Sequence, residues 1–349
     1  MSTDNRSHPP GTPPFAARLS RRALLTGGAA AAVGVLASPV ASRVAAQTLS
    51  WDAGDGIALG AYIEGDRDDG GRIDRYVGLV GRTPALVGWY LDWAYGGNFN
   101  RSHADLIAER GAMPMLTWEP KDHTIIGPNQ PAFTLARILG GEYDAFITGW
   151  ARDVAAWGKP IFIRLAHEMN GDWYPWSPGV NGNTTPQYAA MWRYVVDIFR
   201  REGATNVRWV WAPNAFAPTL PPLDALYPGD AYVDWVGTSV FNWGTSETWG
   251  RWAECADVLT PVYEAATRLT NKPLMLSELG AVEAGGSKAR WITQALMRDI
   301  PTRFPLVRGV VWFHDHSRQA NDWRVNTSLS ALDAFKRAAM MPAYRGRFS

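Results

Sequence analysis

Eight short apolar runs, separated by segments with the spacing of helices, predict an α/β fold, a single (β/α)8 TIM barrel. A second observation agrees with this fold: polar and aromatic residues follow the ends of the runs, where such barrels carry their functional residues. The sequence after the N-terminal region contains no fixed repeat, linker or second domain. We therefore assign residues 47–349 to one barrel.

The predicted strands are runs of four to six residues that are apolar almost throughout. They are Ala58–Ile63, Leu86–Leu91, Met113–Thr117, Ile161–Leu165, Val207–Trp211, Trp235–Val240, Leu274–Ser277 and Gly309–Phe313. The polar and aromatic residues that follow them are Glu64, Asp92, Trp93, Trp118, Glu119, His167, Glu168, Asn214, Asn242, Trp243, Glu278 and His314.

Helices are predicted between the strands. Ser102–Arg110 begins with a capping serine, Tyr143–Trp157 has apolar residues at helical spacing, and Thr185–Glu202 begins with a capping threonine followed by proline. Further helices are expected at Thr248–Thr270, Ser287–Ile300 and Ser328–Met340.

Residues 1–46 are interpreted as a twin-arginine signal peptide and N-terminal region. The pair Arg21-Arg22 precedes the small, apolar stretch Thr26–Val40, and Val44–Ala46 offers small residues for cleavage near Gln47. The stretch is shorter than the ~20 residues that span a bilayer, so we expect no stable membrane insertion after signal removal. An N-terminal membrane anchor is the alternative. The pattern predicts a secreted or extracytoplasmic protein.

Composition excludes several classes of function. Lys and Arg number 34 against 33 Asp and Glu, a net charge of +1, so we expect no nucleic-acid partner. The single cysteine, Cys255, cannot form an intramolecular disulfide, and thiol chemistry is not expected. The 18 tryptophans can either fill a core or stack on the apolar faces of sugars, and composition does not separate these uses.

Two of the predicted strands run into a glutamate. The segment IRLAHEMNGDWYPW carries Glu168, and the segment PLMLSELG carries Glu278. Two carboxyl groups at the mouth of one barrel are suited to glycoside hydrolysis, in which a leaving group is protonated while the anomeric carbon is stabilised. The alternative for either glutamate is an ion pair with an arginine at the rim.

Alternation along the strands is expected to point both carboxylates toward the barrel mouth. If the strands stay extended, Glu168 shares a face with Arg164, and Glu278 shares a face with Leu276. A cation such as Arg164 could then keep Glu278 ionised, or could serve as a purely structural ion-pair partner.

We predict neither a metal site nor a cofactor. His167-Glu168 begins like the zinc-protease motif H-E-x-x-H, but Gly171 stands where that motif requires histidine. His314 and His316 lie close in sequence, yet no third partner can be located for them.

At these residues the chain resembles glycoside hydrolase family 26, from about Leu59 to Phe335. The strongest matches are RLAHEMNGDWYPW and, about 110 residues later, LSELG. The resemblance implies a retaining (β/α)8 enzyme in which Glu168 is the general acid/base and Glu278 the nucleophile. It also implies that His167, which precedes the acid/base, forms a hydrogen bond near the site.

Other residues are candidates for binding sugar. Trp173 and Trp176 are predicted to form a platform on the loop that follows Glu168, and Arg164 and Asn242 are expected at the site. Trp118, Trp243 and Trp312 stand at other strand ends and could line the site, with core packing as the alternative for each of them.

One departure from the family bears on the nucleophile. Many relatives carry, after the sixth strand, a tyrosine whose hydroxyl can hold the nucleophile, and this chain has Phe241 in its place. We expect that hydrogen bond to be lost or supplied by Asn242.

The sequence thus predicts a secreted, monomeric, retaining endo-β-glycanase that acts on a β-linked polysaccharide or oligosaccharide. β-1,4-Mannan comes first because it is the commonest substrate in the resembled family. Mixed-linkage β-1,3-1,4-glucan comes second and β-1,3-xylan third. A non-hydrolytic carbohydrate-binding barrel is the alternative from a different functional class.

Overall fold

The computed structural model describes residues 54, 56–63, 70–95, 97–215, 221–316 and 321–348. The predicted signal peptide and Glu64 lie outside these residues. Within them, none of the helices combines the length and the apolar character that crossing a membrane requires.

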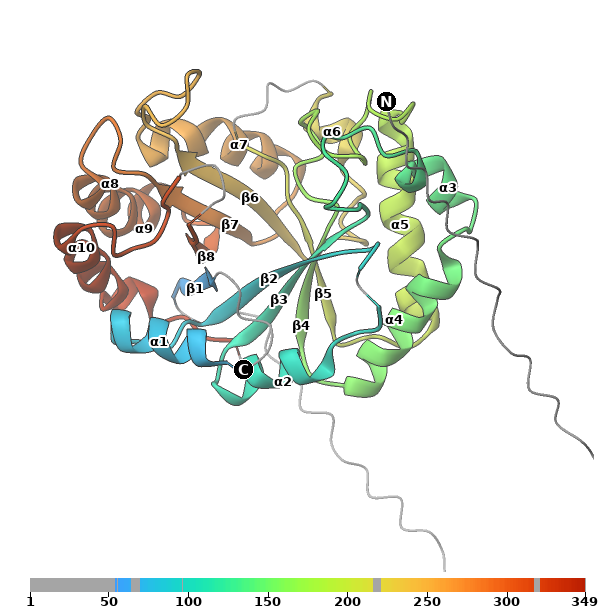
Figure 1. The fold of residues 1–349 in the computed structure, drawn as a ribbon, viewed down its shortest axis with the longest axis horizontal. Coiled ribbons are helices and arrows are strands. Elements are labelled where there is room, and N and C mark those ends of the chain that lie inside the picture. Colours follow the sequence, from blue (N-terminus) through green and yellow to red (C-terminus); the bar gives the residue numbers. More distant parts are fainter. Residues whose placement is uncertain are drawn as a thin grey trace, which may run out of the picture. The chain divides into compact units, whose positions relative to one another are not determined.

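The strands form a closed parallel barrel in sequence order, β1 to β8, which confirms the predicted (β/α)8 fold (Figure 1). Every predicted run is a strand, and several strands extend further toward the barrel mouth than expected. The strands are β1 (Ala58–Ile63), β2 (Leu86–Asp92), β3 (Met113–Glu119), β4 (Ile161–Leu165), β5 (Val207–Trp211), β6 (Trp235–Asn242), β7 (Leu274–Ala281) and β8 (Val307–His314).

Helices cover the outside of the barrel (Figure 1). The longer ones are α1 (Gly71–Val80), α2 (Arg101–Glu109), α4 (Asp144–Trp157), α5 (Thr185–Arg201), α7 (Cys255–Leu269) and α10 (Leu329–Ala339). Shorter ones are α3 (Leu135–Leu139), α6 (Leu223–Leu226), α8 (Lys288–Gln294) and α9 (Ile300–Arg303), with a π-helical turn at Ala295–Asp299. The sequence analysis did not identify α1, α3 or α6.

One predicted helix begins later than expected. Thr248–Thr270 was predicted as helical, but α7 starts at Cys255, and residues 243–254 form a loop. The side-chain oxygen of Asn242 accepts hydrogen bonds from the backbone N–H groups of Gly244 and Ala253, each at 3.1 Å. These bonds hold the two ends of the loop together just ahead of α7.

The barrel interior is apolar near the N-terminal ends of the strands and polar above. Phe162, Trp235 and Met275 belong to the apolar lower layer. Phe348, near the chain terminus, closes this layer, with its ring centroid 5.0 Å from that of Phe162. A second and larger apolar layer lies between the strands and the helices. Arg164, one inward position above Phe162 on β4, begins the polar part.

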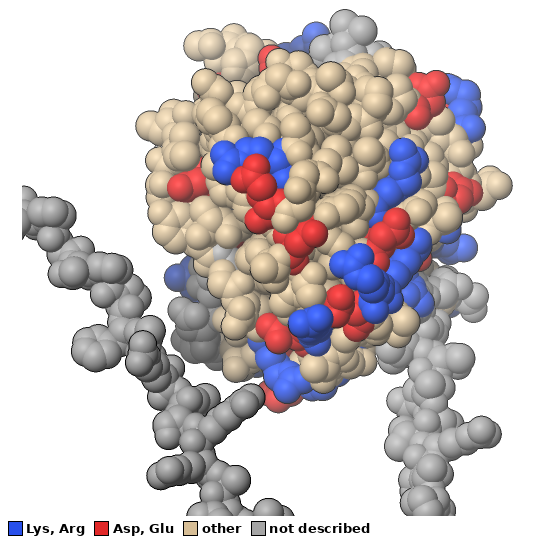
Figure 2. All heavy atoms as spheres, turned by 90° about the vertical axis from the view of Figure 1, so that its right-hand side faces the viewer, with Lys and Arg blue, Asp and Glu red and all other residues tan. Residues whose placement is uncertain are grey.

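Charged side chains of both signs are intermingled on the face that Figure 2 shows, where no region of a single sign stands out. Among the described residues, Arg152 pairs with Glu202 at 2.8 Å, and Lys159 pairs with Asp105 at 2.7 Å. This mixture agrees with the formal net charge of +1.

The contact between β1 and β2 predicts a strong effect of one substitution. A Cβ atom on Gly60 would lie 2.6 Å from the carbonyl oxygen of Leu86, which is backbone and cannot move aside easily. We expect Gly60→Ala to lower the free energy of unfolding by about 1–3 kcal/mol. Denaturant unfolding checks this value.

Gly78→Ala is the matched control. Nothing lies within 4 Å of a Cβ placed on Gly78, which is in the exposed part of α1. This change should raise stability by about 0.4–1 kcal/mol, because alanine has the higher helix propensity. Equal effects of the two substitutions would contradict the close packing of β1 on β2.

Candidate active site

The polar upper layer of the barrel is organised around Arg164, whose side chain is buried. Its Nε donates to Thr117 Oγ1 at 3.0 Å, and its Nη1 donates to Ser277 Oγ at 3.1 Å. Its Nη2 donates to the Tyr90 hydroxyl at 3.0 Å and to Glu278 Oε1. One guanidinium therefore joins β2, β3, β4 and β7.

Electrostatics favour a charged Arg164. Burial by itself lowers the pKa of a guanidinium, but the carboxylate of Glu278 and its hydrogen bond outweigh burial, so the pKa of Arg164 is raised. Removing one partner of a buried ion pair strongly destabilises the folded protein, because the remaining charge is left buried without a partner. Glu278 is therefore tied to Arg164 by charge as well as by geometry.

Glu278 reaches this position through a bulge in β7. Leu274 and Leu276 face the outer apolar layer, while Met275 faces the barrel interior, so simple alternation would turn Glu278 outward. The register against β6 shifts at this point: Leu276 pairs with Thr238 and Glu278 with the next residue, Ser239. The prediction that Leu276 and Glu278 share a face was therefore wrong, and the inserted residue brings Glu278 inward.

Glu168 is positioned by an irregular turn, because β4 does not stay extended as assumed from the sequence. Ala166 and Glu168 have positive φ angles of 42° and 55°, which residues other than glycine adopt rarely. The N–H of Glu168 donates to Ala212 O at 2.7 Å. Such backbone strain persists where the surroundings enforce it, and it concentrates at functional sites.

The environment of Glu168 favours its protonated form. Burial is the largest cause that raises the pKa of Glu168, and the charge of Glu278 raises it further. Hydrogen bonds to the carboxylate partly oppose this rise, among them the one from Trp173 Nε1 to Oε2 at 2.9 Å. The two carboxyl groups are thus close enough to interact, and their surroundings differ.

The tyrosine that holds Glu278 comes from β2. The Tyr90 hydroxyl donates to Glu278 Oε1, and burial together with the charge of Glu278 keeps the pKa of Tyr90 well above its usual value. Phe241 instead packs on Trp323 and Phe313, with ring centroids at 4.8 and 5.5 Å. Tyr90 was not predicted as a site residue, because a tyrosine inside an apolar strand carries no signal of its partner.

Asn242 does not take the role that was expected of it. Its side chain is fully buried, and its oxygen accepts the two loop hydrogen bonds from Gly244 and Ala253. Asn242 therefore shapes the loop after β6 and does not contact Glu278.

Three of the candidate sugar-binding tryptophans are buried completely, so direct stacking on a sugar was a wrong expectation for them. Trp118 packs among the rings of Trp93 and Trp150. Trp176 stacks on Tyr174 at 4.4 Å and donates to His167 O, and Trp312 donates to Trp323 O at 2.9 Å. These indoles build the scaffold of the site.

The remaining candidates lie at the site in different ways. Trp173 is 40% exposed and bonds directly to Glu168, and Trp243 is half-buried on the loop after β6. His167 is buried beside Tyr174, with ring centroids 4.8 Å apart. Burial, followed by the charges of Arg164 and Lys121, lowers the pKa of His167 well below its usual value, so the imidazole is neutral.

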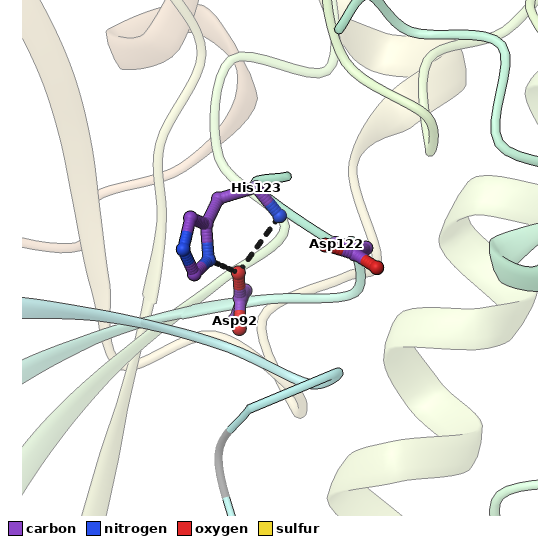
Figure 3. A group of neighbouring side chains, drawn as sticks. All are labelled: Asp92, Asp122 and His123. Atoms are coloured by element: carbon purple, nitrogen blue, oxygen red, sulfur yellow. Dashed lines mark hydrogen bonds and ion pairs between the residues drawn. The ribbon is translucent and has the colours of Figure 1, made fainter. Parts of the chain in front are cut away.

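Acidic groups also gather where β2 and β3 end (Figure 3). Ligand atoms of Asp92, Asp122 and His123 lie within 4.8 Å of one another. Asp92 already accepts hydrogen bonds from the backbone and the ring of His123, and Asp122 Oδ1 accepts two from Thr124. Figure 3 shows the His123 ring directed at Asp92 and the Asp122 side chain directed away from it. The contacts between His123 and Asp92 join the loop after β3 to the end of β2.

Comparisons with known proteins agree with this site. The family model described as Glycosyl hydrolase family 26 matches residues 131–340. Endoglucanase H of Acetivibrio thermocellus is 37% identical over 287 residues, which cover 81% of this chain and 30% of that protein. A mannan endo-1,4-beta-mannosidase of Bacillus subtilis is 28% identical over 260 residues, 66% of each chain. The chain thus spans less than a third of the length of Endoglucanase H.

A solved structure supports the fold. The modular endo-β-1,4-mannanase of Cellulomonas fimi superposes with a TM-score of 0.63 over 84% of this chain and 72% of that one, at 20% sequence identity. At this identity the likeness is evidence for the barrel fold and does not extend to the substrate.

The interaction between the two carboxyl groups can be measured. Glu278→Gln removes a negative charge that disfavours ionisation of Glu168, so the pKa of Glu168 should fall in this variant. Titration of the glutamate side-chain carboxyl carbons by NMR checks the direction. Glu142→Gln, at an exposed glutamate that pairs with Arg137, is the control and should leave the pKa of Glu168 unchanged. An unchanged or raised pKa in Glu278→Gln would show that the two groups do not interact.

Proposed function

Because the chain belongs to glycosyl hydrolase family 26, we propose that it is a retaining endo-β-glycanase that cleaves a β-linked polysaccharide by double displacement. The observation that carries the proposal is the pair of buried carboxyl groups, Glu168 and Glu278, which have different surroundings at one barrel mouth. One is favoured in its protonated form, and the other is held by a cation and a hydroxyl. This asymmetry is what an acid/base and a nucleophile need.

In the first step, the Glu278 carboxylate attacks the anomeric carbon while Glu168 gives its proton to the departing glycosidic oxygen. In the second step, Glu168 takes a proton from water, which attacks the same carbon and releases Glu278. Trp173 supports this cycle because its N–H stabilises the Glu168 carboxylate after proton transfer. Arg164 and Tyr90 keep Glu278 oriented throughout.

For the substrate, we propose β-glucan first and β-1,4-mannan second. The expectation from family frequency alone put mannan first. The identity of 37% to a protein named Endoglucanase H, against 28% to a mannosidase, supports the reverse order. The twin-arginine pattern around Arg21-Arg22 supports action outside the cytoplasm.

Chemical rescue tests the assignment of the nucleophile. The wild-type protein should cleave an activated aryl β-glycoside, and Glu278→Ala should be slower by at least about a thousandfold. Azide should restore turnover in Glu278→Ala by attacking the anomeric carbon in place of the missing carboxylate, with release of the aryl group. Glu142→Ala, at the exposed pair with Arg137, should behave as wild type with or without azide. Oligosaccharide binding without turnover by the wild type would favour the non-hydrolytic barrel.

A substrate panel tests the order of glycans. Reducing ends released from barley β-glucan, carboxymethyl cellulose, galactomannan and β-1,3-xylan should show the highest kcat/KM on a β-glucan. Glu278→Ala on each glycan gives the background. A higher value on galactomannan than on both glucans would reverse the proposed order and leave the two-carboxylate mechanism intact.

A further inference from the structure

Aromatic rings extend without a break from the catalytic centre to the rim of the barrel. Tyr90, which bonds to Glu278, has its ring centroid 6.4 Å from that of Phe313, and Phe313 lies 5.5 Å from Phe241. From Phe241 the contacts continue outward to Trp323 at 4.8 Å. The end of β6 is thereby connected to the polar centre through rings from three strands.

Beyond Phe241, three indoles form what we call the aromatic wall: Trp323, Trp243 and Trp249. Trp243 meets Trp323 edge-on at 4.8 Å and 87°, and Trp249 packs on Trp243 at 5.1 Å and 58°. Exposure rises along the wall, because Trp323 is buried, Trp243 is half-buried and Trp249 is 66% exposed. The outermost indole, Trp249, thus rests on Trp243, which in turn rests on Trp323, and Trp249 still presents much of its surface to solvent.

The base of the wall is fixed by hydrogen bonds. The backbone N–H of Trp323 donates to Asp315 O at 2.9 Å, and its carbonyl accepts from Trp312 Nε1 at 2.9 Å. On either side of Trp323, the fully buried ammonium group of Lys288 donates to the carbonyls of Asp322 and Arg324, at 3.2 and 2.6 Å. Trp323 therefore has little freedom to move.

The loop that carries Trp249 is fixed as well. In addition to the two bonds to Asn242, Thr245 N donates to Ala284 O at 3.1 Å, and Ser246 Oγ donates to Trp243 O at 2.7 Å. Asn321 Nδ2 donates to Glu247 Oε1 at 2.9 Å and so joins the loops that follow β6 and β8. A single exposed apolar side chain is ordinary on a protein surface. Trp249 differs because an ordered loop carries it and the ring of Trp243 packs against it.

We propose that the aromatic wall, with Trp249 as its outer face, binds a sugar unit of the polysaccharide chain that lies beyond the units next to the cleaved bond. The inference rests on the proposed glycanase function. The apolar face of a pyranose ring stacks on an indole, and a platform that is rigid before binding loses little conformational entropy when sugar binds. The wall then favours long substrates over short ones, because only a glycan chain that reaches from Glu278 to Trp249 gains binding affinity from it.

Kinetics as a function of chain length test the platform. We expect Trp249→Ala to lower kcat/KM on the polysaccharide and on a six-unit oligosaccharide about three- to tenfold, mainly through KM. The same variant should leave kcat/KM on an aryl glycoside of one or two units unchanged, and Trp249→Phe should lie in between. Met340→Ala, at a side chain 56% exposed where α10 ends, is the control and should match wild type on every substrate. Equal losses on short and long substrates, or no loss on either, would overturn the proposal.

A binding measurement separates this proposal from the proposed function. Calorimetric titration of Glu278→Ala and of Glu278→Ala/Trp249→Ala with two-unit and six-unit β-gluco- and manno-oligosaccharides needs no turnover. If the double variant binds only the six-unit ligand more weakly, the platform is supported. This holds even if the wild type hydrolyses nothing, a result that would refute the proposed glycanase function and leave the platform intact. Identical affinities of the two variants for every ligand would overturn the platform even if wild type is an active enzyme.

Discussion

The buried guanidinium of Arg164 is the constraint on which the upper half of the barrel depends. A cation in the interior must have its charge balanced and its N–H groups accepted, or it destabilises the fold strongly. Three strands answer this demand: β2 with Tyr90, β3 with Thr117, and β7 with both Ser277 and Glu278. The barrel interior therefore changes from apolar at Phe162 to polar one inward position later, and the same contacts orient the proposed nucleophile.

Both carboxyl groups are delivered by departures from regular strand geometry. Glu278 follows a bulge in β7, and Glu168 lies in a turn after β4 in which Ala166 and Glu168 itself have positive φ angles. In a regular β7, the Glu278 side chain would point toward the surrounding helices and could not pair with Arg164. The ion pair and the hydrogen bonds of the polar layer offset the cost of these irregularities, so the barrel can hold two acidic groups near each other in different surroundings.

The strands could be predicted because their runs are apolar almost throughout, and the two glutamates because each follows the end of such a run. The rest needed the structure for physical reasons. The bulge at Ser277 leaves no mark in the local pattern, and the partnership of Tyr90 with Glu278 joins residues 188 positions apart. Trp150 of α4 packs on Trp118, Phe335 of α10 packs on Trp312, and Tyr174 stacks on Trp176, and no strand-end position reveals these contacts. Residues 248–254 were predicted as the first part of a helix, but they belong to a loop whose two ends are bonded to the side chain of Asn242.

The tryptophans differ in how far their side chains are exposed, and this difference bears on sugar binding. In the described part of the chain, Trp173 and Trp249 are the tryptophans with exposed side chains. The first is fixed by its N–H to Glu168 and the second by rings beneath it, so each is ordered without being buried. An ordered, exposed indole offers contact area at a small entropic cost, whereas a mobile one must be immobilised by the ligand. Trp173 can therefore assist at the reacting bond, whereas Trp249 contacts only longer glycan chains. Longer chains are then bound more tightly at the proposed catalytic pair than shorter ones.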